Sequence, residues 1–141
     1  MGNSAGALAN DLSTSLTAVN IVAVGLGAAI GAWLRWLLSL ALNLIVPTLP
    51  LGTLVVNLAG GFMIGVAFAY FAAQLNSAPY WRLFVITGFL GGLTTFSAFS
   101  AEAMVLLQRG QYGWALLHSG SHLMGSIACC IAGYAVDRAF N

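Results

Sequence analysis

The residues with the most chemical potential lie in one stretch of the chain, residues 91–100. Its sequence is GGLTTFSAFS, so two adjacent glycines precede four hydroxyl side chains and two phenylalanines. The stretch lies inside an apolar segment, residues 83–107, that is long enough to cross a bilayer. Because lipid offers no hydrogen-bond partner, backbone freed at that depth must face protein or a watery cavity. We therefore predict that a membrane helix is interrupted here and that the interruption forms a site.

Hydrogen-bond donors, rather than acids, dominate this stretch and the other polar positions of the chain. Glu102 is the only acid well inside an apolar segment. A cation or proton pathway normally shows acidic residues within its helices, whereas a small anion needs donors. Phe96 and Phe99 are three residues apart and share a helix face. Their ring edges carry partial positive charge and can meet an anion, and ordinary packing is the alternative interpretation of this pair.

Polar residues in two other segments follow a helical period. Thr53 and Asn57 are four residues apart and therefore share a face. An unpaired amide in lipid is costly, so Asn57 is expected either to face a wet path or to bond a neighbouring helix. A second stripe indicates an aqueous track or a seam between subunits, and it consists of His118, Ser119, His122 and Ser126.

The composition of the chain places these residues in a membrane protein. Of the 141 residues, 60% are hydrophobic and 5% are charged, whereas a soluble domain carries about 25% charged residues. The net charge of +1 gives no argument for nucleic-acid binding. No catalytic constellation is visible in the sequence, so an enzyme is not expected.

Four segments are long enough to span the membrane. Each exceeds the roughly 20 residues that cross the hydrocarbon core, and prolines or polar clusters near 47–50, 76–79 and 108–111 separate them. The spans are expected at residues 19–42, 51–75, 81–107 and 112–136. Residues 1–16 are expected to form a polar tail without the basic region of a cleaved signal peptide. Residues 17–141 are expected to form the four-helix transmembrane domain.

The positions of the arginines and glycines bear on topology and assembly. Two arginines fall on each predicted side of the membrane, so the excess of basic residues that normally sets orientation is missing. The chain is expected either to insert in both directions and pair with an antiparallel copy, or to follow one topology set by a weak bias. Glycine pairs at G-x-x-x-G spacing predict close helix packing, and they are Gly27 with Gly31, Gly61 with Gly65, and Gly88 with Gly92.

Residues 91–100 resemble the signature of the small fluoride channels of the Fluc or CrcB family. Residues 31–36 (GAWLRW) and 52–61 (GTLVVNLAGG) also resemble that family, and the resemblance extends over all four spans. It implies an all-α membrane protein with four transmembrane helices per subunit, of which the third is broken at mid-membrane. It further implies a dual-topology, antiparallel homodimer in the lipid bilayer of the bacterial inner membrane, which exports cytoplasmic fluoride passively.

The resemblance also implies roles for individual residues. The backbone carbonyls of Gly91 and Thr94 are implied to hold a structural sodium ion at the centre of the dimer, and carbonyl oxygens suit such a cation. Arg35 is implied to be a vestibule charge, with an interfacial arginine that reaches toward water as the alternative. The residues implied along the fluoride pathway are Asn57, Thr95, Phe96, Ser97, Phe99, Glu102, His122 and Ser126.

Two residues depart from the family's pattern. Ala98 stands where threonine is common, and His122 stands where small hydroxyl residues are usual. If His122 faces the pore, fluoride flux is expected to depend on pH between about 5 and 8, because imidazole titrates near neutrality. A metal site at His118 and His122 is the alternative, since histidines four residues apart can chelate, although the sequence pattern offers no further ligands.

A small dual-topology multidrug exporter coupled to protons is the competing interpretation of the whole chain. Such exporters resemble it in size and charge balance. They need a carboxylate in the first span to exchange protons for cationic drugs, whereas the first span here contains Arg35 and no acid. A purely structural membrane adaptor would leave the interrupted helix and its aligned donors without a purpose.

Overall fold

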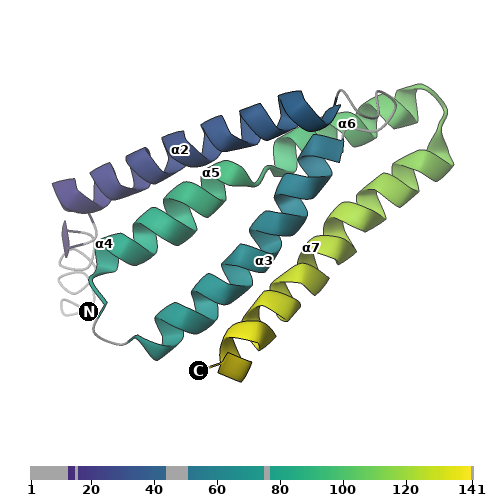
Figure 1. Ribbon diagram of the computed structural model, residues 1–141. Coiled ribbons are helices and arrows are strands. Elements are labelled where there is room, and N and C mark those ends of the chain that lie inside the picture. The colour runs from purple at the N-terminus through teal and green to yellow at the C-terminus, as the bar shows by residue number, and fades with distance from the viewer. Residues whose placement is uncertain (1–12, 15, 44–50, 75–76, 141) are drawn as a thin grey trace, which may run out of the picture.

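The computed structural model describes residues 13–14, 16–43, 51–74 and 77–140. Within these ranges the chain is helical apart from short turns and one extended segment (Figure 1). Most of the predicted polar tail and the prolines at 47–50 that are expected to separate the first two spans lie outside the described residues. For the described part of the chain, the expectation of an all-α protein is confirmed.

Four helical segments of this part are long and apolar enough to cross a membrane, as the sequence predicts. They run over Ala18–Leu42, Leu51–Ala73, Pro79–Gln108 and Tyr112–Phe140. The first corresponds to α2 (Ala18–Asn43), the second to α3 (Leu51–Ala73) and the fourth to α7 (Tyr112–Phe140). The third span begins at Pro79. Proline is common at the first position of a helix, where its missing N–H would have no helical acceptor.

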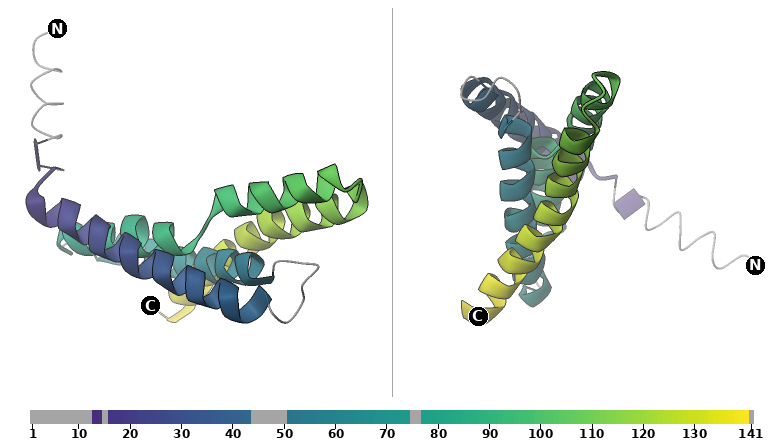
Figure 2. Two further views of the ribbon diagram at one scale, coloured as in Figure 1. Left: turned by 90° about the horizontal axis from the view of Figure 1, so that it is seen from above. Right: turned by 90° about the vertical axis from the view of Figure 1, so that its right-hand side faces the viewer.

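The third span consists of two helical halves. The first half comprises α4 (Pro79–Arg82), η1 (Leu83–Leu90) and α5 (Gly91–Leu93), and the second half is α6 (Phe96–Gln108). The helix α2 lies along the first half, whereas α3 lies along α7 (Figure 1). Seen from above, α6 and the beginning of α7 diverge together from the other helices (Figure 2). The span therefore changes its packing partners where its two halves meet.

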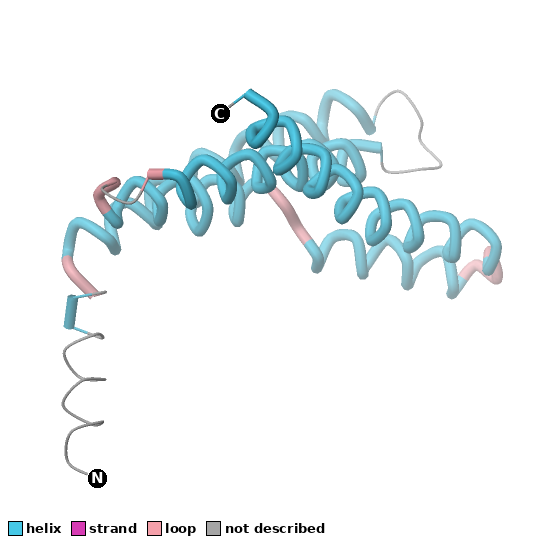
Figure 3. Tube along the Cα trace, turned by 90° about the horizontal axis from the view of Figure 1, so that it is seen from below, coloured by secondary structure: helices cyan, strands magenta, loops and turns pink. Residues whose placement is uncertain are grey.

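The residues between the two halves are Thr94 and Thr95. Thr94 (φ −82°, ψ 156°) and Thr95 (φ −151°, ψ 120°) are both extended, and they form the loop near the middle of the span in Figure 3. The predicted interruption is therefore confirmed. The sequence does not predict that η1 is a π-helix, a winding that is rare and often occurs near functional sites.

The buried core is small and lies where α3 meets the first half of the third span. Val56, Leu90 and Leu93 are the largest side chains that are fully buried. Large apolar side chains remain exposed on the outer faces, with Trp33 67% and Leu116 76% exposed. Exposed apolar surface on this scale is expected where lipid or another subunit covers the protein.

Glycines bring the helix backbones into close contact, as their spacing predicts. A Cβ atom on Gly88 of η1 would lie 2.8 Å from the Val24 carbonyl oxygen and 3.0 Å from the Cα of Gly27, both in α2. A Cβ atom on Gly61 of α3 would lie 2.8 Å from the carbonyl oxygen of Ser126 in α7. Since the atoms in the way belong to backbone, a larger residue at these positions would push the helices apart.

Candidate functional site

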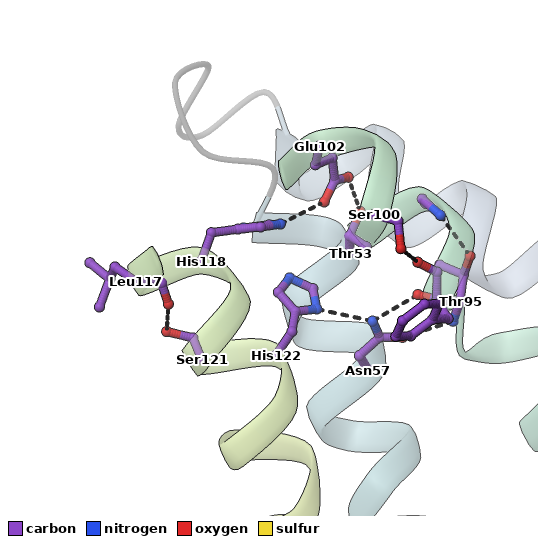
Figure 4. A network of polar contacts seen from close by, with 11 residues as sticks. Thr53, Asn57, Thr95, Ser100, Glu102, Leu117, His118, Ser121 and His122 are labelled. Atoms are coloured by element: carbon purple, nitrogen blue, oxygen red, sulfur yellow. Dashed lines mark hydrogen bonds and ion pairs between the residues drawn. The ribbon is translucent and has the colours of Figure 1, made fainter. Parts of the chain in front are cut away.

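Asn57 of α3 holds the backbone of the interruption (Figure 4). Its Oδ1 accepts a hydrogen bond from the N–H of Thr95 at 2.8 Å, and its Nδ2 donates to the carbonyl oxygen of Thr95 at 3.0 Å. The two bonds satisfy polar backbone that has left the helix and that would be costly to leave unpaired in lipid. Of the two roles expected for Asn57, the bond to a neighbouring helix is therefore present, and the role in the pore stays a prediction.

Two backbone N–H groups at the interruption are diverted from their usual helical acceptors. In an α-helix each N–H bonds the carbonyl four residues earlier, which for Thr95 is the carbonyl of Gly91. The N–H of Thr95 donates to Asn57 instead. The N–H of Ala98 would likewise bond the carbonyl of Thr94, but it donates to Oγ1 of Thr95 at 3.2 Å. The carbonyls of Gly91 and Thr94 thereby lose their helical donors, and they are the two that the family resemblance implies as sodium ligands, which stays a prediction.

The guanidinium group of Arg35 bonds the end of the first half of the interrupted span. Its Nε donates to the carbonyl oxygen of Gly92 at 3.1 Å. The last carbonyls of a helix have no helical donor, so this bond satisfies one of them. Arg35 is half-buried. Its predicted role as a vestibule charge stays a prediction, while its contact with the interruption is one that the sequence did not indicate.

Phe96 and Phe99 of α6 share a face, as their spacing predicts. Their rings meet edge to face with centroids 5.2 Å apart. Phe96 is 76% exposed, which does not fit packing within this chain. Phe99 is half-buried, and its ring stacks on that of His122 with 4.9 Å between centroids. The exposed ring of Phe96 is therefore free to meet an anion or a second subunit.

His122 of α7 joins the network around Asn57. Its Nδ1 lies 3.0 Å from Nδ2 of Asn57. Because the amide nitrogen only donates, Nδ1 accepts, and the neutral ring carries its proton on Nε2. The side chain is 4% exposed, and Nε2 has no hydrogen-bond partner among the described residues. His122 thus presents a buried, unused donor next to the interruption.

A second polar cluster lies next to this network, where α3, α6 and α7 meet (Figure 4). Thr53 donates from Oγ1 to Oε1 of Glu102 at 2.6 Å. Nε2 of His118 lies 3.4 Å from Oε2 of Glu102, a distance suited to an ion pair when His118 is protonated. Thr53 and His118 are buried, and the side chain of Glu102 is 21% exposed. The predicted place of Glu102 at an aqueous entry stays a prediction.

A cavity of about 590 Å³ opens beside the interruption. Its walls come from α3, α6 and α7, so residues of three different spans meet there. Phe96 and Phe99 form part of its apolar wall. Its polar lining consists of Asn57, Thr94, Thr95, Ser119, His122 and Ser126.

Most of the residues predicted for an ion path therefore lie in one place. Asn57, Thr95, Phe96, Phe99, His122 and Ser126 line the cavity. The hydroxyl of Ser97 lies 3.3 Å from that of Thr95 and is exposed, whereas Glu102 belongs to the neighbouring cluster. The sequence assigned no partner to Thr53, although its spacing from Asn57 was a signal that both side chains face the same neighbours.

Comparison with known proteins gives a consistent picture. The family described as "CrcB-like protein, Camphor Resistance (CrcB)" matches residues 22–134. A "Fluoride-specific ion channel FluC" of Cupriavidus pinatubonensis is 59% identical over 109 residues, which cover 77% of this chain and 86% of that protein. Proteins of the same name match from Nitrosospira multiformis (57% over 113 residues, 80% and 88% covered) and from Burkholderia cenocepacia (54% over 121 residues, 86% and 94% covered).

Proposed function

The chain belongs to the family of CrcB-like proteins, and on that basis we propose that it is a fluoride-specific ion channel. It is a multi-pass membrane protein with four spans and not an enzyme. The proposed direction of transport is passive export of cytoplasmic fluoride across the bacterial inner membrane, driven by the membrane potential. No acidic residue of the first span is available for proton exchange, which leaves a coupled exporter without its usual proton carrier.

The observation that carries this proposal is the set of neutral donors around the interrupted helix. Fluoride is small and holds its water tightly, so a selective path must replace that water with compact donors. Hydroxyl, amide and imidazole groups from α3, from the residues between α5 and α6 and from α7 line the cavity, and the amide hydrogens of Asn57 bond Thr95 and His122 there. The edges of Phe96 and Phe99 add weak positive potential without adding a formal charge. A path of this kind can bind fluoride and still release it.

We extend the proposal to a structural sodium ion at the interruption. The carbonyls of Gly91 and Thr94 suit such an ion because their helical donors are diverted to Asn57 and Thr95. Carbonyl oxygens are good ligands for a hard cation, and hard cations take about six oxygen ligands. One chain offers two such carbonyls here, so the remaining ligands would come from a second subunit or water.

A second, antiparallel copy of the chain is the proposed source of those ligands. Phe96 is 76% exposed beside the cavity and would be covered in a dimer. The balanced arginines of the sequence permit insertion in both directions. Cysteine labelling from each side of the membrane should then modify a given loop position from both sides, and a one-sided pattern would remove the dual topology.

Fluoride efflux from liposomes that contain the purified chain tests the channel itself. Efflux of fluoride in the presence of a potassium ionophore, with chloride efflux as the matched control, is the expected result. Equal rates for the two anions, or no fluoride efflux, would overturn the proposal.

A further inference from the structure

Three buried ligand atoms converge between α6 and α7. Among the described residues, Oε2 of Glu102, Nε2 of His118 and Nε2 of His122 have no hydrogen-bond partner. His118 is 6% and His122 is 4% exposed. One ligand atom from each of the three residues lies within 4.8 Å of the others. From this convergence we infer that Glu102, His118 and His122 form a binding site for a divalent transition-metal ion of the zinc class.

The distances between the ligand atoms suit such an ion. A tetrahedral zinc ion with ligands at about 2.0–2.1 Å holds neighbouring ligand atoms about 3.4 Å apart. Oε2 of Glu102 and Nε2 of His118 lie 3.4 Å apart, close to that separation, and no hydrogen bond joins them. The remaining ligand atom is at most 4.8 Å from the others. To complete the site, the His122 ring would have to move toward the other two ligand atoms.

The donor set selects the class of metal. Two imidazoles and a carboxylate favour zinc and its neighbours in the first transition row over magnesium or sodium. Three protein ligands leave a fourth position for water or another small ligand. Thr53 already supplies an outer contact, because its hydroxyl donates to Oε1 of Glu102 and leaves Oε2 to face the histidines. The site uses side chains only and is separate from the carbonyls of Gly91 and Thr94.

A purely structural polar cluster would account less well for the same atoms. Buried polar side chains normally find hydrogen-bond partners, and each exception calls for an explanation. Here Nε2 of His122 carries a proton without an acceptor, and the contact between His118 and Glu102 is not a hydrogen bond. An ion between these three atoms would satisfy all of them together.

Metal binding would change the state of His122. In the metal-free chain Nδ1 accepts from Asn57, so the ring proton lies on Nε2. To bind a metal through Nε2, the neutral ring must move its proton to Nδ1, and Nδ1 can then no longer accept from Asn57. The metal therefore competes with the Asn57–His122 bond. Since Asn57 also holds the backbone of Thr95, the metal is coupled to the interruption.

The position of the cluster allows an ion to reach it from water. Glu102 lies six residues before the end of α6, and His118 lies six residues after the start of α7. At about 1.5 Å per residue, both lie about 9 Å from the same end of the helix pair. The side chain of Glu102 is 21% exposed although its Oε2 is buried, so of the three residues it lies nearest to water.

Calorimetric titration of the purified full chain with zinc tests the site. The protein is prepared in detergent with a tag that contains no histidine and is stripped with a chelator. We expect one zinc ion per chain. Affinity should fall at least about tenfold in Glu102→Gln and His118→Gln, and about 10- to 100-fold in Thr53→Val, which loses only the outer contact. Visible absorption of bound cobalt should report tetrahedral coordination and should disappear in Glu102→Gln and His118→Gln.

The controls use the other soft donors of the chain and a variant chosen to fold. Cys129→Ala with Cys130→Ala should bind zinc normally, since both thiols lie outside the cluster. His122→Ser places a small hydroxyl at this position. It should elute from gel filtration at the same volume as the wild type, which shows that it folds, and it should bind zinc more weakly. No zinc binding, unchanged affinity in Glu102→Gln and His118→Gln, or loss of binding in the cysteine variant would each overturn the site.

A flux measurement addresses the consequence of binding, and this step rests on the proposed fluoride channel. Zinc should slow fluoride efflux from liposomes at concentrations that match the calorimetric affinity, and a chelator should restore it. His118→Gln should be insensitive to zinc. If the chain binds zinc but conducts no fluoride at all, the proposed function fails and the metal site stands. If zinc binds but leaves fluoride efflux unchanged, the coupling through Asn57 is wrong.

Discussion

Arg35 of α2 donates from Nε to the carbonyl oxygen of Gly92, 57 residues further along the chain. The contact joins the first span to the end of the first half of the third. It places a basic side chain where helix carbonyls lack partners. The first span therefore takes part in shaping the interruption, although it contributes no side chain to the lining of the cavity.

Replacing Arg35 should lower the stability of the chain. Arg35→Gln removes a charge-assisted hydrogen bond, which should cost about 1.5–3 kcal/mol. Thermal unfolding in detergent, followed by circular dichroism, measures the change. Arg35→Lys keeps the charge but not the Nε–H geometry. Its melting temperature should therefore lie between those of Arg35→Gln and the wild type. Equal melting of Arg35→Gln and the wild type would show that the bond contributes nothing.

Asn57 should tolerate no substitution that loses either half of its amide. Asn57→Leu leaves the N–H and carbonyl of Thr95 unpaired, so fluoride efflux should fall by at least about tenfold, and the chain should unfold at lower temperature. Asn57→Asp keeps an acceptor for the Thr95 N–H but faces the Thr95 carbonyl with a second oxygen. It should also reduce efflux, because it places negative charge in an anion path. Wild-type efflux in either variant would contradict the double role of Asn57.

Phe96 and Phe99 should matter for flux more than for folding. Phe96→Ile should slow fluoride efflux and leave the fold of the single chain nearly unchanged, because the ring is 76% exposed within that chain. Phe99→Ile should slow efflux as well, and it should cost more stability because its ring stacks on two histidines. Gel filtration should show the same assembly for both variants as for the wild type. Normal efflux in Phe96→Ile would remove the ring edge from the path.

Protonation of His122 should change fluoride efflux as the medium is acidified from neutral pH, because the ring accepts a hydrogen bond from Asn57 only while it is neutral. When the ring binds a second proton, Nδ1 becomes a donor and the bond from Asn57 is lost. That bond is therefore present at high pH and absent at low pH. The groups that face the ring are Asn57, Phe99, His118 and, through His118, Glu102. Efflux measured during the same acidification should be flatter in His122→Ser, and an identical profile would show that another group titrates.

Two glycines of α2 offer a matched test of helix packing. A Cβ atom on Gly27 would lie 2.8 Å from the Phe89 backbone nitrogen, whereas one on Gly25 would meet nothing within 4 Å. Gly27→Ala should therefore destabilise the chain by several kcal/mol or prevent its assembly. Gly25→Ala should be neutral or stabilising by about 0.5–1 kcal/mol, because alanine is the better helix former. Similar melting of the two variants would contradict the close approach of α2 and η1.

The four spans and the interruption were predictable because their causes are local. Hydropathy over about 20 residues marks a span, and the glycines and hydroxyls around Thr94 and Thr95 mark the interruption within it. The face shared by Thr53 and Asn57 follows from helical spacing alone. Each of these features depends on residues that are close in the sequence.

The partners of the polar side chains were not predictable from one sequence. Asn57 pairs with Thr95 across 38 residues, and Thr53 pairs with Glu102 across 49. Such pairs depend on how the helices pack, which hydropathy and spacing do not determine. For the same reason the sequence did not identify Glu102 as the third residue of the cluster with His118 and His122. The π-helical η1 was missed because its sequence has the apolar character of an ordinary membrane helix.

The extended residues Thr94 and Thr95 create two helix ends in the middle of one span. The end of α5 carries the partial negative charge of a helix C-terminus, and the start of α6 carries the partial positive charge of an N-terminus, each about half an elementary charge. One interruption thus has two poles of opposite sign within a few residues of each other, and Arg35 bonds the negative pole through the carbonyl of Gly92. In the proposed channel, these poles would stabilise ions of both signs beside Thr94 and Thr95 without a formal charge on either residue.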